Sequence, residues 1–366
     1  MPEPKSWKVS LHGGHSGDFC AHGADTLREL LDAAVAFGYT TFGVTPHSPP
    51  AIAKFLYEEE IEAGFSADDL AQKFRDYSVL NSALIDKYSG QMEVLRGAEV
   101  EVVPDATFAD RAVALKADND LDYLVGSVHW VDELPFDTSQ KDFDRAVVNR
   151  GGLEPFLLRY FQLVGQMIEQ LSPEVIGHFD LPRLFAEGAP ELESESVKGA
   201  VADVLEKVST AGSILDLNVG ALSRKLVTPY PAPWIVRIAS DIGVPFCFGD
   251  DSHGPDQVGL DLERETRFLG RLGELGPASH RLPRLMVTPF VFGIAGEAEA
   301  FVASPEVAEV FWIQLGELRS PQVHSKVQIP LPEGLREFPC YRVAGEVVWG
   351  LTFRILEQFL EIHSAL

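Results

Sequence analysis

Short apolar runs alternate with amphipathic stretches from the N-terminus to about Gly259. The runs are rich in Val, Phe, Ile and Leu, which is typical of buried parallel strands. Seven of them occupy residues 7–11, 40–45, 92–100, 121–128, 174–179, 213–219 and 244–249. Apolar residues at helical spacing lie between them, at 25–38, 67–88, 156–171, 195–210 and 231–243.

Seven strand–helix repeats predict an α/β fold in which each crossover is right-handed. We expect a distorted (β/α)7 barrel of the TIM type, closed or nearly closed. A doubly wound open sheet is the alternative, but its ligand site gathers residues at one switch point and not at nearly every strand end.

The pattern changes after Gly259. Residues 285–296, 306–315 and 326–331 are apolar and strand-like, and residues 347–363 have a helical pattern. We therefore predict two domains, a barrel over residues 1–259 and a small α+β appendage over residues 260–366.

Histidines and carboxylates stand at the ends of the predicted barrel strands. The C-terminal ends of parallel barrel strands meet at one mouth, where barrel enzymes carry their active sites. A core histidine or a capping carboxylate could explain each residue alone, but neither explains why they recur at the same end of successive strands. The set is His12, His15, His22, His47, Glu99, His129, His178, Asp251 and His253.

Neutral imidazole and carboxylate are preferred ligands of zinc, manganese and iron. Nine such groups suffice for two or three ions. In multinuclear sites a shared carboxylate and a water of lowered pKa bridge the ions, and that water becomes the nucleophile. His280, His324 and His363 are isolated, and we interpret them as surface or packing residues. Cys20 and Cys247 form no CxxC pair and are interpreted as bystanders, with Cys20 as a minor ligand the alternative.

The composition narrows the partners of such a site. The net charge of −25 disfavours nucleic acid and anionic membranes, which need a basic surface. A small phosphate ester, drawn in by metal ions or a few arginines, fits better. Three cysteines, no signal-peptide pattern and no membrane-length apolar run predict a cytoplasmic protein.

Ordered segments of the first domain resemble the PHP superfamily, and most closely its histidinol-phosphatase branch. They are HGGHSGDFCAHGADTL, FGVTPHSPP, IAKFLYEEE, RGAEVEV, VGSVHW, VIGHFDLPRLF, LDLNVGAL, YPAP and FGDDSHG. The resemblance implies a (β/α)7 barrel with three divalent ions. It implies one ion on His12, His15, Glu99 and Asp251, a second on Glu99, His129 and His178, and a third on His22, His47 and His253.

Two positions depart from the family pattern. The family opens with His-x-His, whereas this chain has HGGH, so His12 either reaches in from one residue earlier or leaves the first ion short of a ligand. Pro46 stands where an acidic residue usually precedes His47, which affects a hydrogen bond behind that ligand.

Two arginines follow the fifth and sixth strands. Arg183 and Arg224 are candidate phosphate ligands, because a guanidinium grips phosphate through two parallel hydrogen bonds. An ordinary surface salt bridge is the alternative for each. Asn218, at the end of the sixth strand, also has a position from which it could point inward.

The C-terminal segment resembles the second half of a Nudix hydrolase of the coenzyme A diphosphatase kind, in RLPRLMVTPFVF, SPEVAEVFWIQLGEL and FPCYRVAGEVVWGLTFRIL. The Nudix box, whose glutamates bind magnesium, is absent. The resemblance therefore implies a segment without pyrophosphatase activity, which packs on the barrel or joins copies of the chain into an oligomer.

These observations predict a metal-dependent phosphomonoesterase, with L-histidinol phosphate as the substrate that the resemblance implies. A metal-bridging hydroxide held by Glu99 and Asp251 would attack phosphorus. Another small phosphate ester or a nucleotide is the alternative substrate. A non-catalytic metal- or ligand-binding barrel with a C-terminal interaction module is the alternative of another class. A Schiff-base aldolase is disfavoured, since no lysine ends any predicted strand.

Overall fold

A computed structural model describes residues 8–21, 23, 25–224, 226–259, 267–271, 290–293, 312–331 and 334–365. The chain divides into two compact units, Met1–Asp261 and Leu262–Leu366. Among the described residues, no helix has both the length and the apolar character that a membrane span requires.

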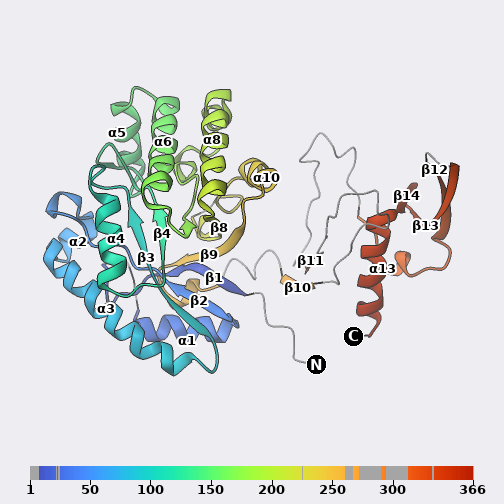
Figure 1. Ribbon diagram of the computed structural model, residues 1–366, viewed down its shortest axis with the longest axis horizontal. Coiled ribbons are helices and arrows are strands. Elements are labelled where there is room, and N and C mark those ends of the chain that lie inside the picture. The colour runs from blue at the N-terminus through green and yellow to red at the C-terminus, as the bar shows by residue number, and fades with distance from the viewer. Residues whose placement is uncertain are drawn as a thin grey trace. The chain divides into compact units, whose positions relative to one another are not determined.

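The first unit is built on seven parallel strands that close into a barrel, which confirms the predicted fold class (Figure 1). Each predicted run contributes one strand, although the fifth pairs over only two residues. In barrel order the strands are β1 (Val9–Gly14), β2 (Thr41–Val44), β3 (Glu93–Glu101), β4 (Tyr123–Ser127), β7 (Val175–Ile176), β8 (Ile214–Asn218) and β9 (Phe246–Ser252).

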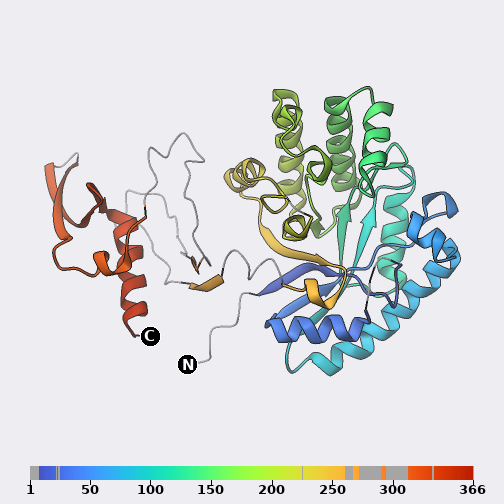
Figure 2. The same cartoon turned by 180° about the vertical axis from the view of Figure 1, so that it is seen from behind.

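Helices surround the strands, as the views from both sides show (Figures 1 and 2). The main ones are α1 (Leu27–Phe37), α3 (Ala67–Tyr88), α4 (Phe108–Asp118), α5 (Gln140–Asn149), α6 (Leu153–Leu171), α8 (Glu195–Ala211) and α10 (Pro233–Ile242). Short ones are α2 (Glu58–Glu62), α7 (Arg183–Ala186) and α9 (Gly220–Ser223). Among the main helices α4 and α5 lie outside the predicted helical ranges, and so do the three short ones.

Local signals fix where the helices begin and end. Helix α1 starts in a capping box, in which the Thr26 side chain accepts from the Glu29 amide and Glu29 accepts from the Thr26 amide. It ends at Gly38, whose φ of 90° lies in the left-handed region that glycine adopts most readily. Ser66 and Asp69 make the same box at the start of α3.

The apolar core fills the space between the barrel and its helices. Its largest cluster joins α5, α6, α8 and α10 to the strands through buried residues such as Phe156, Tyr160, Leu205 and Leu215. Helices α6 and α8, of 19 and 17 residues, each bury an apolar face in this core and thereby support the strands whose ends carry the site.

A hairpin follows β4 and lies beside the site. Strands β5 (Trp130–Val131) and β6 (Leu134–Pro135) pair antiparallel, and the amide of Phe136 donates to the carbonyl of His129 at 3.1 Å. The hairpin therefore begins at a candidate ligand and returns to it.

The second unit contains a three-stranded antiparallel sheet and a helix. The strands are β12 (His324–Leu331), β13 (Gly334–Val343) and β14 (Glu346–Trp349), and the helix is α13 (Gly350–Ala365). The prediction of a helix from residue 347 was wrong at its start, because 347–349 pair with β13 and the helix begins at Gly350. Strands β10 (Arg267–Arg271) and β11 (Phe290–Gly293) form a separate pair, and α12 (Leu315–Leu318) precedes β12. Most of the predicted strand at 306–315 lies outside the described residues.

Candidate metal centre

The barrel brings eight of the nine predicted ligands to the C-terminal ends of its strands. His12 and Glu99 lie on β1 and β3, and Asp251 lies on β9. His15, His47, His129, His178 and His253 follow their strands within one to three residues. His22 lies outside the described residues.

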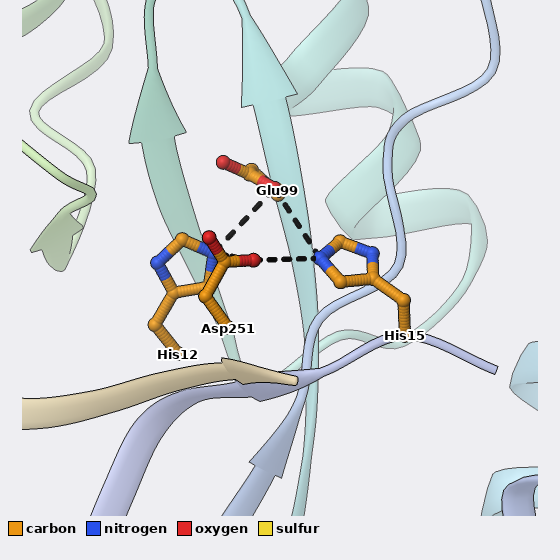
Figure 3. Close-up of side chains that lie close together, drawn as sticks. All are labelled: His12, His15, Glu99 and Asp251. Carbon is orange, nitrogen blue, oxygen red and sulfur yellow. Dashed lines mark hydrogen bonds and ion pairs between the residues drawn. The ribbon is translucent and has the colours of Figure 1, made fainter. Parts of the chain in front are cut away.

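Four side chains converge on one point between β1, β3 and β9 (Figure 3). His15 Nε2 lies 3.2 Å from Asp251 Oδ1 and 3.7 Å from Glu99 Oε2. His12 Nε2 lies 3.5 Å from Glu99 Oε2 and 3.8 Å from Asp251 Oδ1. Metal–ligand bonds of about 2.0–2.2 Å separate neighbouring ligand atoms by roughly 3–4 Å. These four groups therefore have the spacing of a coordination shell.

An irregular β1 brings both histidines of HGGH to the same site. Ser10 pairs with Phe42 and Gly14 with Val44, so β1 advances four residues while β2 advances two. The extra residues form a bulge, which re-aims side chains that strict alternation would send to opposite faces. A Cβ at Gly13 would lie 2.2 Å from the carbonyl oxygen of Gly43, so only glycine fits there. Of the two outcomes open for His12, the structure shows that it reaches the cluster.

Asp216 orients His12 from behind. Its Oδ2 lies 2.8 Å from His12 Nδ1 and also accepts a 3.1 Å hydrogen bond from Asn218 Nδ2. A carboxylate on Nδ1 favours the tautomer that leaves the Nε2 lone pair facing the cluster. Sequence analysis missed Asp216, although two polar residues at alternate positions of the apolar run ILDLN were a usable signal. Asn218 does point inward, but onto Asp216.

Two further side chains meet on the other side of Glu99. His178 Nε2 lies 3.0 Å and His129 Nε2 lies 3.5 Å from Glu99 Oε1, and the two nitrogens are 3.2 Å apart. The two oxygens of Glu99 thus face different clusters, which is the geometry of a bridging carboxylate.

Glu101 supports the imidazoles on this side and was also missed by sequence analysis. Its Oε1 lies 2.6 Å from His129 Nδ1 and 3.7 Å from His47 Nδ1, and it accepts a hydrogen bond from the Tyr57 hydroxyl. Glu101 is two residues beyond Glu99 on β3, so both point to the same side of the strand. A carboxylate thus lies at ion-pair distance from the His47 ring, although Pro46 precedes this histidine in the chain.

The third implied ligand set is described only in part. His47 and His253 flank His15, with ring centroids 4.8 and 4.7 Å from its ring. His47 Nε2 also lies 3.4 Å from Glu99 Oε2, and His253 Nδ1 lies 2.8 Å from the carbonyl oxygen of Asp251. These two imidazoles adjoin the first cluster. That they bind an ion together with His22 stays a prediction.

Burial and mutual charge shift the pKa values of the cluster strongly. Burial would raise the pKa of Glu99, but His12 and His47 outweigh it and hold that pKa well below its ordinary value. Burial would lower the pKa of His12, but Glu99 and Asp251 raise it well above the ordinary value. Burial lowers the pKa of His15 to about 3. Some imidazoles thus hold protons beside the carboxylates when no cation is bound, and a metal ion would replace those protons.

The donor set fits divalent metal ions. His129 Nδ1 and His12 Nδ1 each face a carboxylate, so the opposite nitrogens direct their lone pairs into the clusters. His12 Nε2 is buried and makes no hydrogen bond with the described residues. Buried nitrogens aimed at a shared point, with carboxylate oxygens around them, need a proton or a cation between them, and imidazole with carboxylate suits zinc, manganese or iron.

The two arginines predicted to bind phosphate have different surroundings. Arg224 is 35% exposed in its side chain, and its Nη2 lies 3.7 Å from Asp251 Oδ2, at the edge of the first cluster. Arg183 is buried and donates to the hydroxyl and carbonyl of Thr228 and to the carbonyl of Pro229. Its Nε also pairs with Asp180 at 3.1 Å. The described contacts of Arg183 therefore anchor a loop and do not reach the ligands.

The residues interpreted as bystanders have packing contacts. Cys20 is buried and its thiol donates to the carbonyl of Ser16, and Cys247 lies half-buried on β9. His324, in the second unit, packs edge-on against Tyr341 with ring centroids 4.8 Å apart.

Comparisons with known proteins identify the family to which the first unit is similar. The model of the PHP domain family matches residues 12–220. A "probable histidinol-phosphatase" of Schizosaccharomyces pombe is 33% identical over 270 residues, which cover 72% of this chain and 87% of that protein.

Two solved structures share the fold. One, from Listeria monocytogenes and classed with the histidinol phosphatases, has a TM-score of 0.60 at 25% identity, and the match covers 70% of this chain and 99% of that one. The other, histidinol phosphate phosphatase of Lactococcus lactis complexed with zinc, L-histidinol and phosphate, has a TM-score of 0.51 at 13% identity, covering 70% and 90%. The family match ends at residue 220, so the Nudix resemblance of the C-terminal segment stays a prediction.

Proposed function

The chain belongs to the PHP domain family, and on that premise we propose that it is a metal-dependent phosphomonoesterase that hydrolyses L-histidinol phosphate to L-histidinol and phosphate. The observation that carries the proposal is the bridging position of Glu99. Its two oxygens face two clusters of imidazole and carboxylate groups at the mouth of a closed barrel.

We expect His12, His15, Glu99 and Asp251 to hold one divalent ion, and Glu99, His129 and His178 to hold a second. His47 and His253, with His22, would complete a third. When bound, such ions supply the positive charge that lowers the pKa of water and neutralises phosphoryl oxygens. We propose zinc, manganese or iron as the metal bound at these positions.

The chain's own residues prepare the site for hydrolysis. Asp216 and Glu101 fix the orientation of His12 and His129 through their Nδ1 atoms. Arg224 pairs with Asp251 at 3.7 Å and its side chain stays partly exposed, so we expect its charge to be available to a phosphate. Glu99 and Asp251 face the point where the attacking water would be held. Burial of this set excludes bulk water and strengthens each electrostatic interaction.

Turnover by the purified protein tests the proposal. The protein loaded with Mn²⁺ or Zn²⁺ should hydrolyse L-histidinol phosphate with a kcat/KM at least about 100-fold above that for an aryl phosphate such as p-nitrophenyl phosphate. Equal turnover of the two would overturn the substrate assignment. A preference for a nucleotide would support the alternative phosphoesterase.

The non-catalytic alternative predicts a different metal content. The HGGH spacing favours this alternative, because a His12 that stays out of register would leave the first ion short of a ligand. The 3.5 Å between His12 Nε2 and Glu99 Oε2 supports the enzyme instead. Elemental analysis should find about three ions per chain for the enzyme. One ion or none, with no turnover, would favour a binding module.

For the C-terminal unit we propose a role other than Nudix chemistry. The sequence contains no Nudix box, so the full chain should not hydrolyse coenzyme A or a dinucleoside diphosphate. Release of adenosine 3′,5′-bisphosphate from coenzyme A, or of a nucleoside monophosphate from the dinucleoside diphosphate, would contradict this. If the unit joins copies of the chain, light scattering should show an oligomer.

A further inference from the structure

Tyr230 presents a buried hydroxyl that the proposed catalytic machinery does not use. Its side chain is 1% exposed, and its hydroxyl oxygen has no hydrogen-bond partner among the described residues. A buried polar group without a partner costs free energy, so one that persists in a well-packed site calls for an explanation.

Several contacts fix the position of this tyrosine. Its backbone amide and carbonyl pair with Asn218 at 3.1 and 2.8 Å, which ties it to the end of β8. The Arg183 guanidinium lies 5.2 Å from the centroid of the tyrosine ring. Arg183 also donates hydrogen bonds to the carbonyls of Thr228 and Pro229, the two residues that precede Tyr230. The position of the hydroxyl is therefore built into the structure.

The ring lies beside the candidate metal centre. It meets His178 edge-on, with centroids 6.3 Å apart. The charged groups that act on its hydroxyl are Arg224, Asp180, Arg183 and Asp251. Burial raises the pKa of the Tyr230 hydroxyl above its ordinary value, so this group is a neutral hydrogen-bond donor at physiological pH.

We propose that the Tyr230 hydroxyl donates a hydrogen bond to a phosphoryl oxygen of the substrate, beside the guanidinium of Arg224. A phosphate oxygen is a strong acceptor, and a bond from a neutral donor to an anionic acceptor is among the stronger hydrogen bonds in proteins. Arg183 then acts as a positioning residue, because it holds the ring and the loop that carry the donor. The proposal rests on the phosphatase function proposed above.

The test compares Tyr230→Phe with a matched buried tyrosine. Tyr160 is also 1% exposed, but its hydroxyl donates to the carbonyl of Phe179 at 3.1 Å. Both variants lose one hydroxyl from a buried ring. Titration calorimetry with inorganic phosphate on the metal-loaded protein gives the affinity, elemental analysis gives the metal content, and thermal unfolding of the metal-free protein gives the stability.

We expect Tyr230→Phe to raise the Kd of phosphate about 10- to 100-fold, with the metal content unchanged. Its midpoint of thermal unfolding should stay the same or rise, because no hydrogen bond is lost. Tyr160→Phe should show the opposite pattern, with an unchanged Kd and a lower midpoint. A Kd for Tyr230→Phe within twofold of the parent, or a loss of bound metal, would overturn the proposal.

The calorimetric measurement is independent of which ester the enzyme hydrolyses. If the parent protein binds phosphate but does not turn over L-histidinol phosphate, and Tyr230→Phe weakens phosphate binding, the inference stands and the substrate assignment fails. If the parent turns over L-histidinol phosphate and Tyr230→Phe leaves both the phosphate Kd and kcat/KM unchanged, only the inference fails.

Discussion

On the β1 and β9 side of Glu99, the imidazoles of His12 and His15 and the carboxylate of Asp251 converge around Glu99 Oε2. On the β4 and β7 side, the Nε2 atoms of His129 and His178 lie 3.2 Å apart beside Glu99 Oε1. The first side carries two carboxylates in its shell and the second carries only the shared one. Each side has an imidazole backed by a separate carboxylate, Asp216 for His12 and Glu101 for His129.

This difference indicates that one bridging residue joins two sites that are oriented independently. The supports come from different strands, since Asp216 lies on β8 and Glu101 on β3. A substitution in one support should therefore affect its own side first, and only a change in Glu99 should affect both.

The largest effect is expected for Glu99→Gln. An amide cannot bridge two cations as a carboxylate does, so the variant should lose metal from both sides and at least about 1,000-fold in kcat/KM. Elemental analysis and a phosphatase assay check this. Glu93→Gln, on the same strand but exposed, is the control and should retain both properties. Full metal content in Glu99→Gln would mean that the two sides do not share this residue.

The two supports can be tested separately. Asp216→Asn should weaken the affinity of the β1 and β9 side for metal about 10- to 100-fold, and Glu101→Gln should do the same on the β4 and β7 side. Metal content measured after dialysis against increasing chelator should show a different ion leaving in each variant. Loss of the same ion in both would show that the sides are coupled.

The two arginines separate substrate binding from loop anchoring. Arg224→Met should raise the KM or the Kd for phosphate about 10-fold with little change in stability, because its side chain is partly exposed. Arg183→Met should instead lower the free energy of unfolding by about 3–5 kcal/mol, since it leaves the buried carboxylate of Asp180 without its ion pair. Denaturant unfolding and steady-state kinetics of the two variants check these expectations. Equal losses of stability in Arg224→Met and Arg183→Met would contradict the different roles of the two arginines.

The smallest effect is a pH dependence of the metal-free protein. Burial lowers the pKa of His129, but Asp137 and Glu101 outweigh burial and raise it from 6.5 to about 10. The protonated imidazole thus stabilises the fold fully below pH 6.5, and this contribution is lost as the pH rises toward 10. The midpoint of thermal unfolding in EDTA should fall across that window.

Glu101→Gln provides the comparison for this pH effect, because it removes one of the charges that raise the pKa of His129. The variant should show a shallower fall than the parent. If the thermal midpoint of the parent protein in EDTA does not change between pH 6.5 and 10, the metal-free protein does not hold this stabilising proton on His129.

Local signals determined most of the barrel. The predicted helix at 67–88 coincides with α3, because Ser66 and Asp69 cap its start and apolar residues such as Leu70 and Phe74 line its buried face. The strand at 174–179 shortened to Val175–Ile176, since pairing there depends on neighbours that the run itself does not specify. Helices α4 and α5 were missed because each buries only two residues, Phe108 and Ala112 in α4 and Phe143 and Ala146 in α5, and so lacks a long apolar face.

The sequence by itself determined which residue types stand at the ends of the strands, and hence that imidazoles and carboxylates gather at one mouth. Only the tertiary structure decided how they are used. The bulge in β1 places His12 beside His15. The supporting carboxylates Asp216 and Glu101 come from strands far apart in the chain. Arg183 turns to the Thr228–Tyr230 loop, whereas Arg224 faces Asp251. The physical reason is that periodicity reports burial on one strand or helix at a time, whereas register, bulges and ion pairing depend on the neighbour across the barrel.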